Sequence, residues 1–262
     1  MTDAVKLVRR GAVLEVTLDR PKANAINLAT SRELHGAFRM LQDDPELRVA
    51  ILTGAGDRIF SAGWDLKAAV SGGEAPDTDF GPGGFAGLTA FWDLSKPVIA
   101  AVNGVAIAGG CELALAADLM VVAEHAEFAL SEVTVGLVAD AGGIQRLPRR
   151  IPVAIATELL LTGRRFTAHE ARAWGLANAV VPAAELMATA RGLAERIAAA
   201  APLAVTAVKE ILRETDGMSV RAAYEHVAAG KVASHRAMQL SEDAREGAQA
   251  FVERRTPVWK GR

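Results

Sequence analysis

The chain has 262 residues, of which 51% are hydrophobic and 23% charged, and its formal net charge is −2. This length and hydrophobic content suffice for one large domain, or for one domain with a small appendage. The slightly acidic balance argues against nucleic acid as a partner, because nucleic-acid-binding proteins carry a basic surface.

The single cysteine, Cys111, cannot form an internal disulfide, which favours a reducing compartment. Residues 1–6 resemble neither a signal peptide nor a transit peptide. The longest apolar runs reach about ten residues, too few to cross a bilayer. We therefore expect a cytoplasmic protein with no membrane partner.

The first part of the chain alternates strand and helix patterns. Residues 12–18 alternate apolar and polar side chains, as in a half-buried strand. Thr30 and Glu33 resemble a capping box before a helix. Residues 70–84 hold five glycines and two prolines, which predicts a mobile surface loop. Further apolar runs bounded by turns predict a short strand at 49–53 and buried strands at 98–102 and 119–123.

Helical patterns dominate the rest of the chain. Strand signals stop at about residue 183, and Pro202 suits the first turn of a new helix. This order predicts an α/β domain with a helical tail. The expected helices cover 142–148, 151–161, 167–174, a stripe through Leu186, Ala190, Leu193 and Ile197, and then 218–237 and 241–253.

Two glutamates and a glycine pair suggest chemistry. Gly109 and Gly110 precede an apolar helix, so free N–H groups and the positive end of the helix dipole could hold an oxyanion. The alternative is that these glycines only permit tight packing. Glu112 lies in an apolar segment, where a carboxylate is costly unless it is paired or functional, or else it faces outward. The alternation around Glu132 by itself predicts a solvent-facing strand residue.

Four segments resemble the crotonase (enoyl-CoA hydratase/isomerase) superfamily: 61–67 (SAGWDLK), 96–104 (KPVIAAVNG), 109–114 (GGCELA) and 141–148 (AGGIQRLP). The resemblance implies an α/β fold, the ClpP-like crotonase spiral of ββα units with a C-terminal helical segment. Residues 1–200 would form the core with the coenzyme A and active sites. Residues 201–262 would form a trimerisation segment, giving a homotrimer or a hexamer.

The same resemblance implies the site residues. The N–H groups of Gly109 and Trp64 would form an oxyanion hole, and Glu112 and Glu132 would be the catalytic carboxylates. Members that retain both glutamates are typically hydratases or dehydratases. The substrate would be an acyl-CoA thioester, with coenzyme A as part of the substrate, and no cofactor or metal. The implied coenzyme A contacts are Lys22, Ala23, Ala25, Ala62, Asp65, Leu66 and Lys67.

Residues 18–26, 61–69, 74–89 and 257–262 resemble members that act on crotonobetainyl-CoA and L-carnitinyl-CoA, whose acyl chain ends in a trimethylammonium group. Aromatic faces bind such cations, and Trp64, Phe85 and Trp92 are candidates. Asp140 either caps a helix or faces the substrate. The alternatives are a general short-chain enoyl-CoA hydratase, a non-catalytic acyl-CoA-binding subunit, and an RNA-binding member. The sequence departs from the family pattern at Ala108, Ser131 and residues 139–140.

Overall fold

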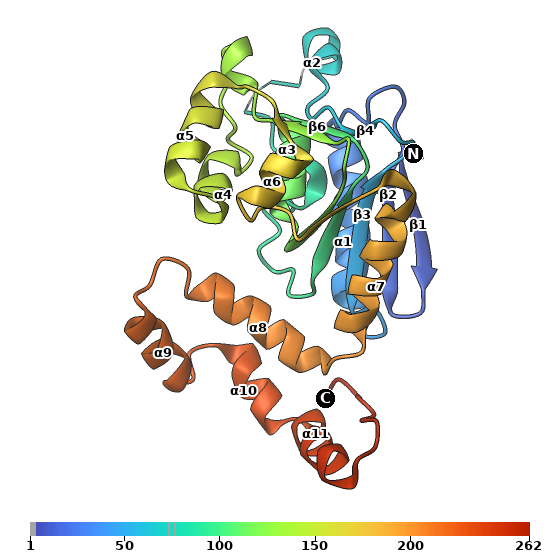
Figure 1. Cartoon of the computed structure of the whole chain (residues 1–262), viewed down its shortest axis with the longest axis vertical. Helices are drawn as coiled ribbons and strands as arrows, with labels where there is room; N and C mark the ends of the chain where they lie inside the picture. The colour runs from blue at the N-terminus through green and yellow to red at the C-terminus, as the bar shows by residue number, and fades with distance from the viewer. Residues whose placement is uncertain (1–3, 73, 76) are drawn as a thin grey trace.

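The computed structural model describes residues 4–72, 74–75 and 77–262, and two sheets form its centre (Figure 1). The larger sheet has the strand order β1-β2-β3-β5-β7-β10. Its first two strands pair in antiparallel fashion and the others are parallel. The bounds are β1 Val5–Arg10, β2 Val13–Leu18, β3 Val49–Gly54, β5 Val98–Val102, β7 Leu119–Ala123 and β10 Ala179–Val181.

The smaller sheet has the order β4-β6-β8-β9, with β9 antiparallel to β8. Strands β3, β5 and β7 of the larger sheet are each followed in the chain by a strand of the smaller sheet. Each turn of the chain therefore adds one strand to both sheets, which is a spiral of ββα units. The bounds are β4 Ile59–Ser61, β6 Val105–Ile107, β8 Glu127–Ala129 and β9 Phe166–Thr167.

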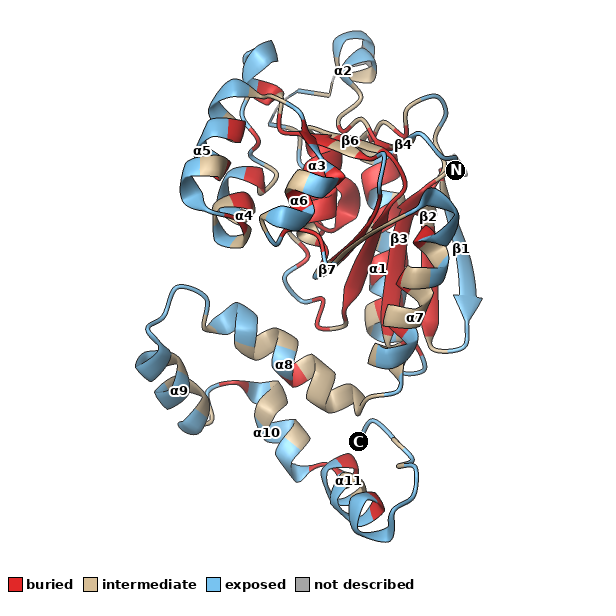
Figure 2. Ribbon diagram, in the orientation of Figure 1, coloured by how far each residue is buried: buried red, intermediate tan, exposed pale blue. Residues whose placement is uncertain are grey.

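Helices cover both faces of the larger sheet. Helix α7 packs on β3, β5 and β7, while α1 lies on the other face and packs on β1, β3 and η1. The strands between them are almost entirely buried, as Figure 2 shows. The helices up to this point are α1 Leu28–Asp43, α2 Leu66–Gly72, η1 Phe85–Gly87, α3 Gly109–Ala116, η2 Glu132–Val135, α4 Gly143–Arg150, α5 Val153–Thr162, α6 Ala168–Ala173, η3 Ala183–Glu185 and α7 Leu186–Ala198.

The last helices form a separate layer below the core, and most of their residues are exposed or only half-buried (Figures 1 and 2). Helix α8 packs on α10, and α10 on α11. Polar contacts tie this layer to the core. Lys209 Nζ donates to the Lys96 carbonyl at 2.9 Å and to Asp118 at 2.8 Å. The helices are α8 Pro202–Glu214, α9 Val220–Ala228, α10 Ala233–Leu240 and α11 Glu242–Glu253.

Most expected elements are confirmed, including the strands at 12–18, 49–53, 98–102 and 119–123 and a helix starting at Pro202. The capping box at Thr30 is wrong, because Asn27 caps α1 by accepting from the Thr30 N–H at 2.9 Å. The helix expected at 218–237 is also wrong. Gly230, with a φ of +67°, lies between α9 and α10.

The loop expected at 70–84 begins later than predicted, since α2 continues to Gly72. Residues 73 and 76 of that loop lie outside the described residues. In the part of the chain that the structure describes, no helix is both long and apolar enough to cross a membrane.

Candidate active site

Both glutamates singled out in the sequence face one cavity of about 210 Å³. Its walls come from the loop before α2, the start of α3, helix η2 and the segment before α4. The structure thus joins segments that are far apart in the sequence. The lining residues are Ala62, Trp64, Leu66, Phe80, Phe85, Ile107, Ala108, Gly109, Glu112, Ser131, Glu132, Val135, Leu137, Val138, Asp140 and Ala141.

Two glycine turns meet at the inner wall of this cavity. Gly63 has a φ of +80°, and a Cβ on it would lie 2.7 Å from the Gly109 nitrogen. A Cβ on Gly109 would in turn lie 2.5 Å from the Phe85 ring. Only glycine allows the two turns to approach this closely. Gly109 therefore permits tight packing, and this does not prevent its N–H from binding an oxyanion.

The N–H groups of Trp64 and Gly109 have no hydrogen-bond acceptor among residues 4–72, 74–75 and 77–262. Ile26 holds the backbone on both sides of Trp64: its N–H donates to the Gly63 carbonyl at 2.7 Å, and its carbonyl accepts from the Asp65 N–H at 2.9 Å. Gly109 is the first residue of α3 and has no intrahelical acceptor. Both donors border the cavity, so both are available to a ligand oxygen.

Glu112 lies on α3 and is only 3% exposed. Its Oε1 accepts a hydrogen bond from the N–H of Gly143 at 2.9 Å. Burial raises the pKa of Glu112 to about 8, opposed by the Gly143 hydrogen bond and reinforced by the charges of Glu132 and Asp140. Glu112 can therefore hold a proton at neutral pH. The alternative of an outward-facing glutamate is wrong, because the side chain is buried and lines the cavity.

Glu132 is the first residue of the 3₁₀ helix η2 and is 8% exposed. The expectation of a solvent-facing strand residue is wrong, because β8 ends at Ala129 and the chain then turns inward. Neither carboxylate oxygen has a hydrogen-bond partner in the described part of the chain. Burial raises the pKa of Glu132. Its own backbone N–H opposes this rise, and the charge of Asp140 adds to it. A buried acceptor without a partner is costly, which favours a ligand there.

Asp140 is exposed at the edge of the cavity. The alternative that it caps a helix is wrong, because the N-cap of α4 is Gly142. Phe80 and Phe85 line the same cavity and pack edge to face with ring centres 5.3 Å apart. One carboxylate and several aromatic rings therefore face the space beside the glutamates.

Trp92 does not belong to this group. It is 63% exposed, and the Arg146 guanidinium lies 5.5 Å from the centre of its ring. Trp92 borders other cavities but not the one that holds the glutamates. One of those cavities is also lined by Phe80, Phe85 and Asp140, so Trp92 lies near the cavity of the glutamates but outside it.

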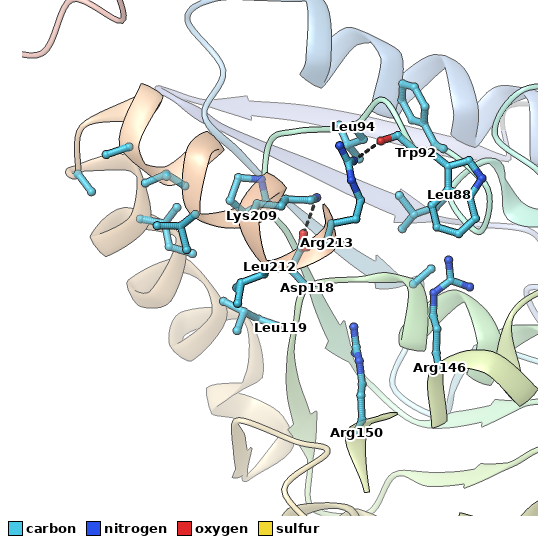
Figure 3. A pocket seen from close by; sticks show the side chains of 18 of the residues that line it. Leu88, Trp92, Leu94, Asp118, Leu119, Arg146, Arg150, Lys209, Leu212 and Arg213 are labelled. Atoms are coloured by element: carbon cyan, nitrogen blue, oxygen red, sulfur yellow. Dashed lines mark hydrogen bonds and ion pairs between the residues drawn. The ribbon is translucent and has the colours of Figure 1, made fainter. Parts of the chain in front are cut away.

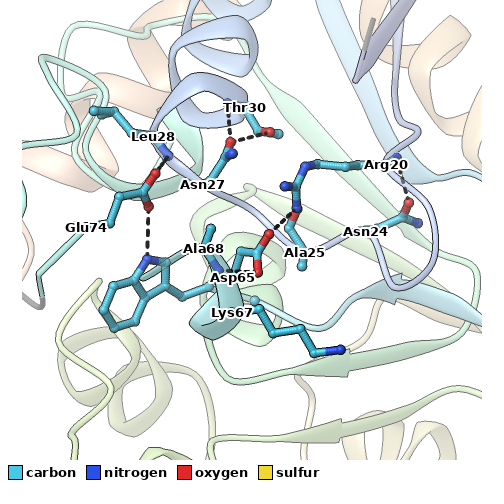
Figure 4. A network of polar contacts seen from close by, with 12 residues as sticks. Arg20, Asn24, Ala25, Asn27, Leu28, Thr30, Asp65, Lys67, Ala68 and Glu74 are labelled. Carbon is cyan, nitrogen blue, oxygen red and sulfur yellow. Dashed lines mark hydrogen bonds and ion pairs between the residues drawn. The ribbon is translucent and has the colours of Figure 1, made fainter. Parts of the chain in front are cut away.

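The two segments expected to contact coenzyme A lie side by side (Figure 4). The Ala62 N–H donates to the Ala23 carbonyl at 3.0 Å. Arg20, which no sequence motif singles out, pairs with Asp65 at 2.7 Å and donates to the Ala25 carbonyl at 2.8 Å. The exposed Lys22 and Lys67 belong to these same segments. Ala62 and Leu66 also line the cavity.

A larger cavity of about 800 Å³ lies between α8 and the core, away from the glutamates (Figure 3). Lys209 and Arg213 of α8 reach across it to Asp118 and to the Trp92 carbonyl. Of the residues expected in the active site, only Trp92 lines it; neither glutamate does. Among the described residues, no group of three or more His, Cys, Asp or Glu side chains could hold a metal ion.

Comparison with known proteins agrees with the fold. The chain is 57% identical to a carnitinyl-CoA dehydratase of Salmonella typhi, over the full length of both. An enoyl-CoA hydratase of Mycobacterium tuberculosis has a crystal structure that matches with a TM-score of 0.90 and 45% identity, covering 99% of each chain. A carnitinyl-CoA hydratase of Mycobacterium avium matches with a TM-score of 0.77 and 44% identity over both whole chains. Residues 9–262 match the enoyl-CoA hydratase/isomerase family, and the chain belongs to that family.

Proposed function

We propose that this protein is a hydro-lyase that reversibly hydrates crotonobetainyl-CoA to L-carnitinyl-CoA. The observation that carries the proposal is the cavity in which two buried glutamates face two backbone N–H groups that have no acceptor among the described residues. A relative that is 57% identical over its full length bears the name carnitinyl-CoA dehydratase. Both observations favour an enzyme that adds or removes water beside a thioester.

The thioester oxygen accepts hydrogen bonds from the N–H groups of Gly109 and Trp64. Negative charge grows on this oxygen as water adds to the double bond. Donors already fixed by the fold stabilise that charge without reorganisation. Gly109 contributes in addition the positive end of the α3 dipole.

Glu112 and Glu132 hold the reacting water between them. One carboxylate removes a proton from the water while the water oxygen bonds to the β-carbon. The pair of glutamates delivers a proton to the α-carbon. Dehydration follows the same path in reverse. The two carboxylates interact, so their protons belong to the pair rather than to either residue. The raised pKa of each glutamate supports this acid–base role near neutral pH.

The trimethylammonium group lies near Asp140 and the rings of Trp64, Phe80 and Phe85. A carboxylate attracts this cation, and aromatic faces stabilise it by roughly 1–2 kcal/mol when water is excluded. Crotonyl-CoA lacks the charge and gains neither interaction. The second candidate function is that of a general short-chain enoyl-CoA hydratase, which the similarity to the M. tuberculosis structure supports.

The binding of coenzyme A and the assembly state stay predictions. We propose that the paired segments around Ala23 and Ala62 bind coenzyme A, with Lys22 and Lys67 near its phosphates. Residues 1–200 form the catalytic core, and residues 201–262 pack against neighbouring subunits of a trimer or hexamer. The exposed apolar side chains of that segment support the assembly. A cytoplasmic location is likewise a prediction from the sequence.

A hydration assay tests the proposed function. Initial rates are measured spectrophotometrically with crotonobetainyl-CoA, crotonyl-CoA and longer enoyl-CoA esters. The expected result is the highest kcat/KM for crotonobetainyl-CoA. An equal or higher value for crotonyl-CoA would favour the general hydratase. Tight binding of all esters without turnover would instead identify a non-catalytic acyl-CoA-binding subunit.

A further inference from the structure

We infer that Glu74 is a positioning residue that fixes the Trp64 ring in the active cavity and thereby sets the preference for an acyl group ending in trimethylammonium. The inference rests on the proposed function. Glu74 is not among the residues that line the cavity, so it acts through Trp64. No feature of the sequence pattern distinguishes it from the other acids of its loop.

The Glu74 carboxylate bridges two elements (Figure 4). Its Oε2 accepts the indole Nε1–H of Trp64 at 3.2 Å. Its Oε1 accepts the backbone N–H of Leu28 at 3.0 Å. Leu28 is the first residue of α1, where N–H groups have no partner within the helix. One carboxylate therefore ties the indole to the end of a well-packed helix.

The backbone and the ring of Trp64 are held by different groups. Ile26 holds the backbone through hydrogen bonds to the residues on either side of Trp64, so the oxyanion N–H is fixed without Glu74. Glu74 holds the ring alone, and Trp64 is a lining residue of the cavity. Loss of Glu74 should consequently disturb recognition of the acyl end more than it disturbs polarisation of the thioester.

The interaction also changes the electrostatics of the ring. A hydrogen bond from an indole N–H to a carboxylate is charge-assisted and increases the electron density on the ring. A ring with a more negative face attracts a quaternary ammonium group more strongly. Glu74 therefore both orients the Trp64 ring and strengthens its attraction for the cation, which an acyl group without charge does not use.

The test compares kcat/KM for crotonobetainyl-CoA and for crotonyl-CoA in Glu74→Ala, Glu74→Gln and the wild type. In Glu74→Ala the ratio of the two values should fall by roughly 3- to 30-fold, mainly through a higher KM for the cationic substrate. Turnover of crotonyl-CoA should stay within about twofold of wild type, which also shows that the variant folds. Glu74→Gln keeps a hydrogen-bond acceptor without the charge, so its kcat/KM ratio should lie between those of Glu74→Ala and the wild type.

A double-mutant cycle shows whether Glu74 acts through the indole. Trp64→Phe removes the N–H donor but keeps an aromatic ring. In that background Glu74→Ala should change the ratio no further, whereas an effect of the Glu74 charge directly on the substrate would persist and overturn the inference. Asp77→Asn, which removes a charge from the same loop, is the matched control and should leave the ratio unchanged.

The remaining outcomes separate the two proposals. If wild type shows no preference for crotonobetainyl-CoA, the proposed function fails and this inference fails with it. If wild type shows the preference and Glu74→Ala retains it, only the inference is wrong. An equal loss for both substrates would likewise overturn it, since that result indicates a general structural role.

Discussion

The backbone N–H of Gly143 donates to Glu112 Oε1 at 2.9 Å, and this contact requires glycine. A Cβ at position 143 would lie 3.1 Å from the same oxygen and 2.9 Å from the Ala139 side chain. Glu132, by contrast, has no partner among the described residues for either carboxylate oxygen. One glutamate is thus held by the start of α4, while the other is free to bind water or substrate.

The first prediction concerns this pair. Glu112→Gln and Glu132→Gln should each lower kcat by roughly 10²- to 10⁴-fold, because each removes a positioned acid–base group. Substrate binding should change little, since glutamine fills nearly the same space. The double variant should lose far less than the product of the two effects, because both residues act on one water.

Glu127→Gln provides the matched control. Glu127 pairs with Arg165 on the exposed side of the same strand region, so its loss should leave turnover unchanged. Steady-state kinetics with the best substrate measure all four variants. Near-wild-type kcat in either single active-site variant would contradict the assignment.

The sequence predicted the long buried elements because their patterns extend over several residues. The apolar runs at β5 and β7 and the proline that starts α8 are such signals. The three-residue strands β4, β6 and β8 are too short to show a period of two, and they were missed. The predicted start of α1 was too late, because the cap is Asn27, which accepts the N–H of Thr30, and not Thr30 itself.

The site residues were predicted mainly through family resemblance. Alternation pointed Glu132 toward solvent, because a sequence pattern does not show where a strand ends and a 3₁₀ turn begins. Proximity in sequence grouped Trp92 with Phe85. The two residues border one cavity, but Trp92 packs beside Arg146 and lies outside the cavity of the glutamates. Glu74 contributes through two hydrogen bonds and Gly143 through one, all to residues outside their own turn of the chain, and such contacts leave no local pattern.

The second prediction follows from the raised pKa of Glu112. Its pKa rises from 4.5 to about 8 on folding, mainly because of burial, with Glu132 and Asp140 adding to the shift and Gly143 and Arg146 opposing it. The folded protein therefore holds a proton that the unfolded chain releases in this window. The contribution of Glu112 to stability is fully present below pH 4.5 and is lost as the pH rises through about 8.

The side chain in Glu112→Gln cannot ionise, so this variant should not lose stability through position 112 as the pH rises. Its melting temperature relative to wild type should therefore increase as the pH rises from about 5 to about 9. Calorimetry across that range measures the difference, with Glu127→Gln as a control that should track wild type. A difference that stays constant with pH would show that Glu112 does not carry a raised pKa.

The third prediction concerns Ala108, the residue before the Gly109 turn. Its φ of 51° and ψ of −126° suit glycine better than alanine. Ala108→Gly should relieve roughly 1–3 kcal/mol of strain, against about 0.5–1 kcal/mol of added chain entropy. We expect an equal or higher melting temperature. Ala106→Gly, in the buried strand β6, is the control and should lower it. Comparable losses in both variants would argue against strain at Ala108.

The fourth prediction concerns assembly. Leu212, Leu240 and Phe251 are exposed apolar residues of the last helices. Light scattering at micromolar concentration should show a trimer or hexamer, and replacing one of these three residues by glutamate should reduce the mass if that residue lies in a subunit interface. Val70→Glu, an exposed change on α2, is the control. A wild-type monomer would contradict the proposed role of residues 201–262.

The last prediction concerns the cation-binding side of the cavity. Asp140 lines the cavity and contributes to the electrostatic environment of both glutamates. Asp140→Asn should lower the ratio of kcat/KM for crotonobetainyl-CoA to that for crotonyl-CoA, because it removes the charge that attracts trimethylammonium. Phe80→Leu should lower the same ratio by removing an aromatic face. Trp92→Leu should leave it unchanged, since Trp92 is 63% exposed and lies outside this cavity. A reduced ratio in Trp92→Leu with wild-type behaviour in Asp140→Asn would place the cation on the other side of Phe85, toward the cavity that Trp92 borders.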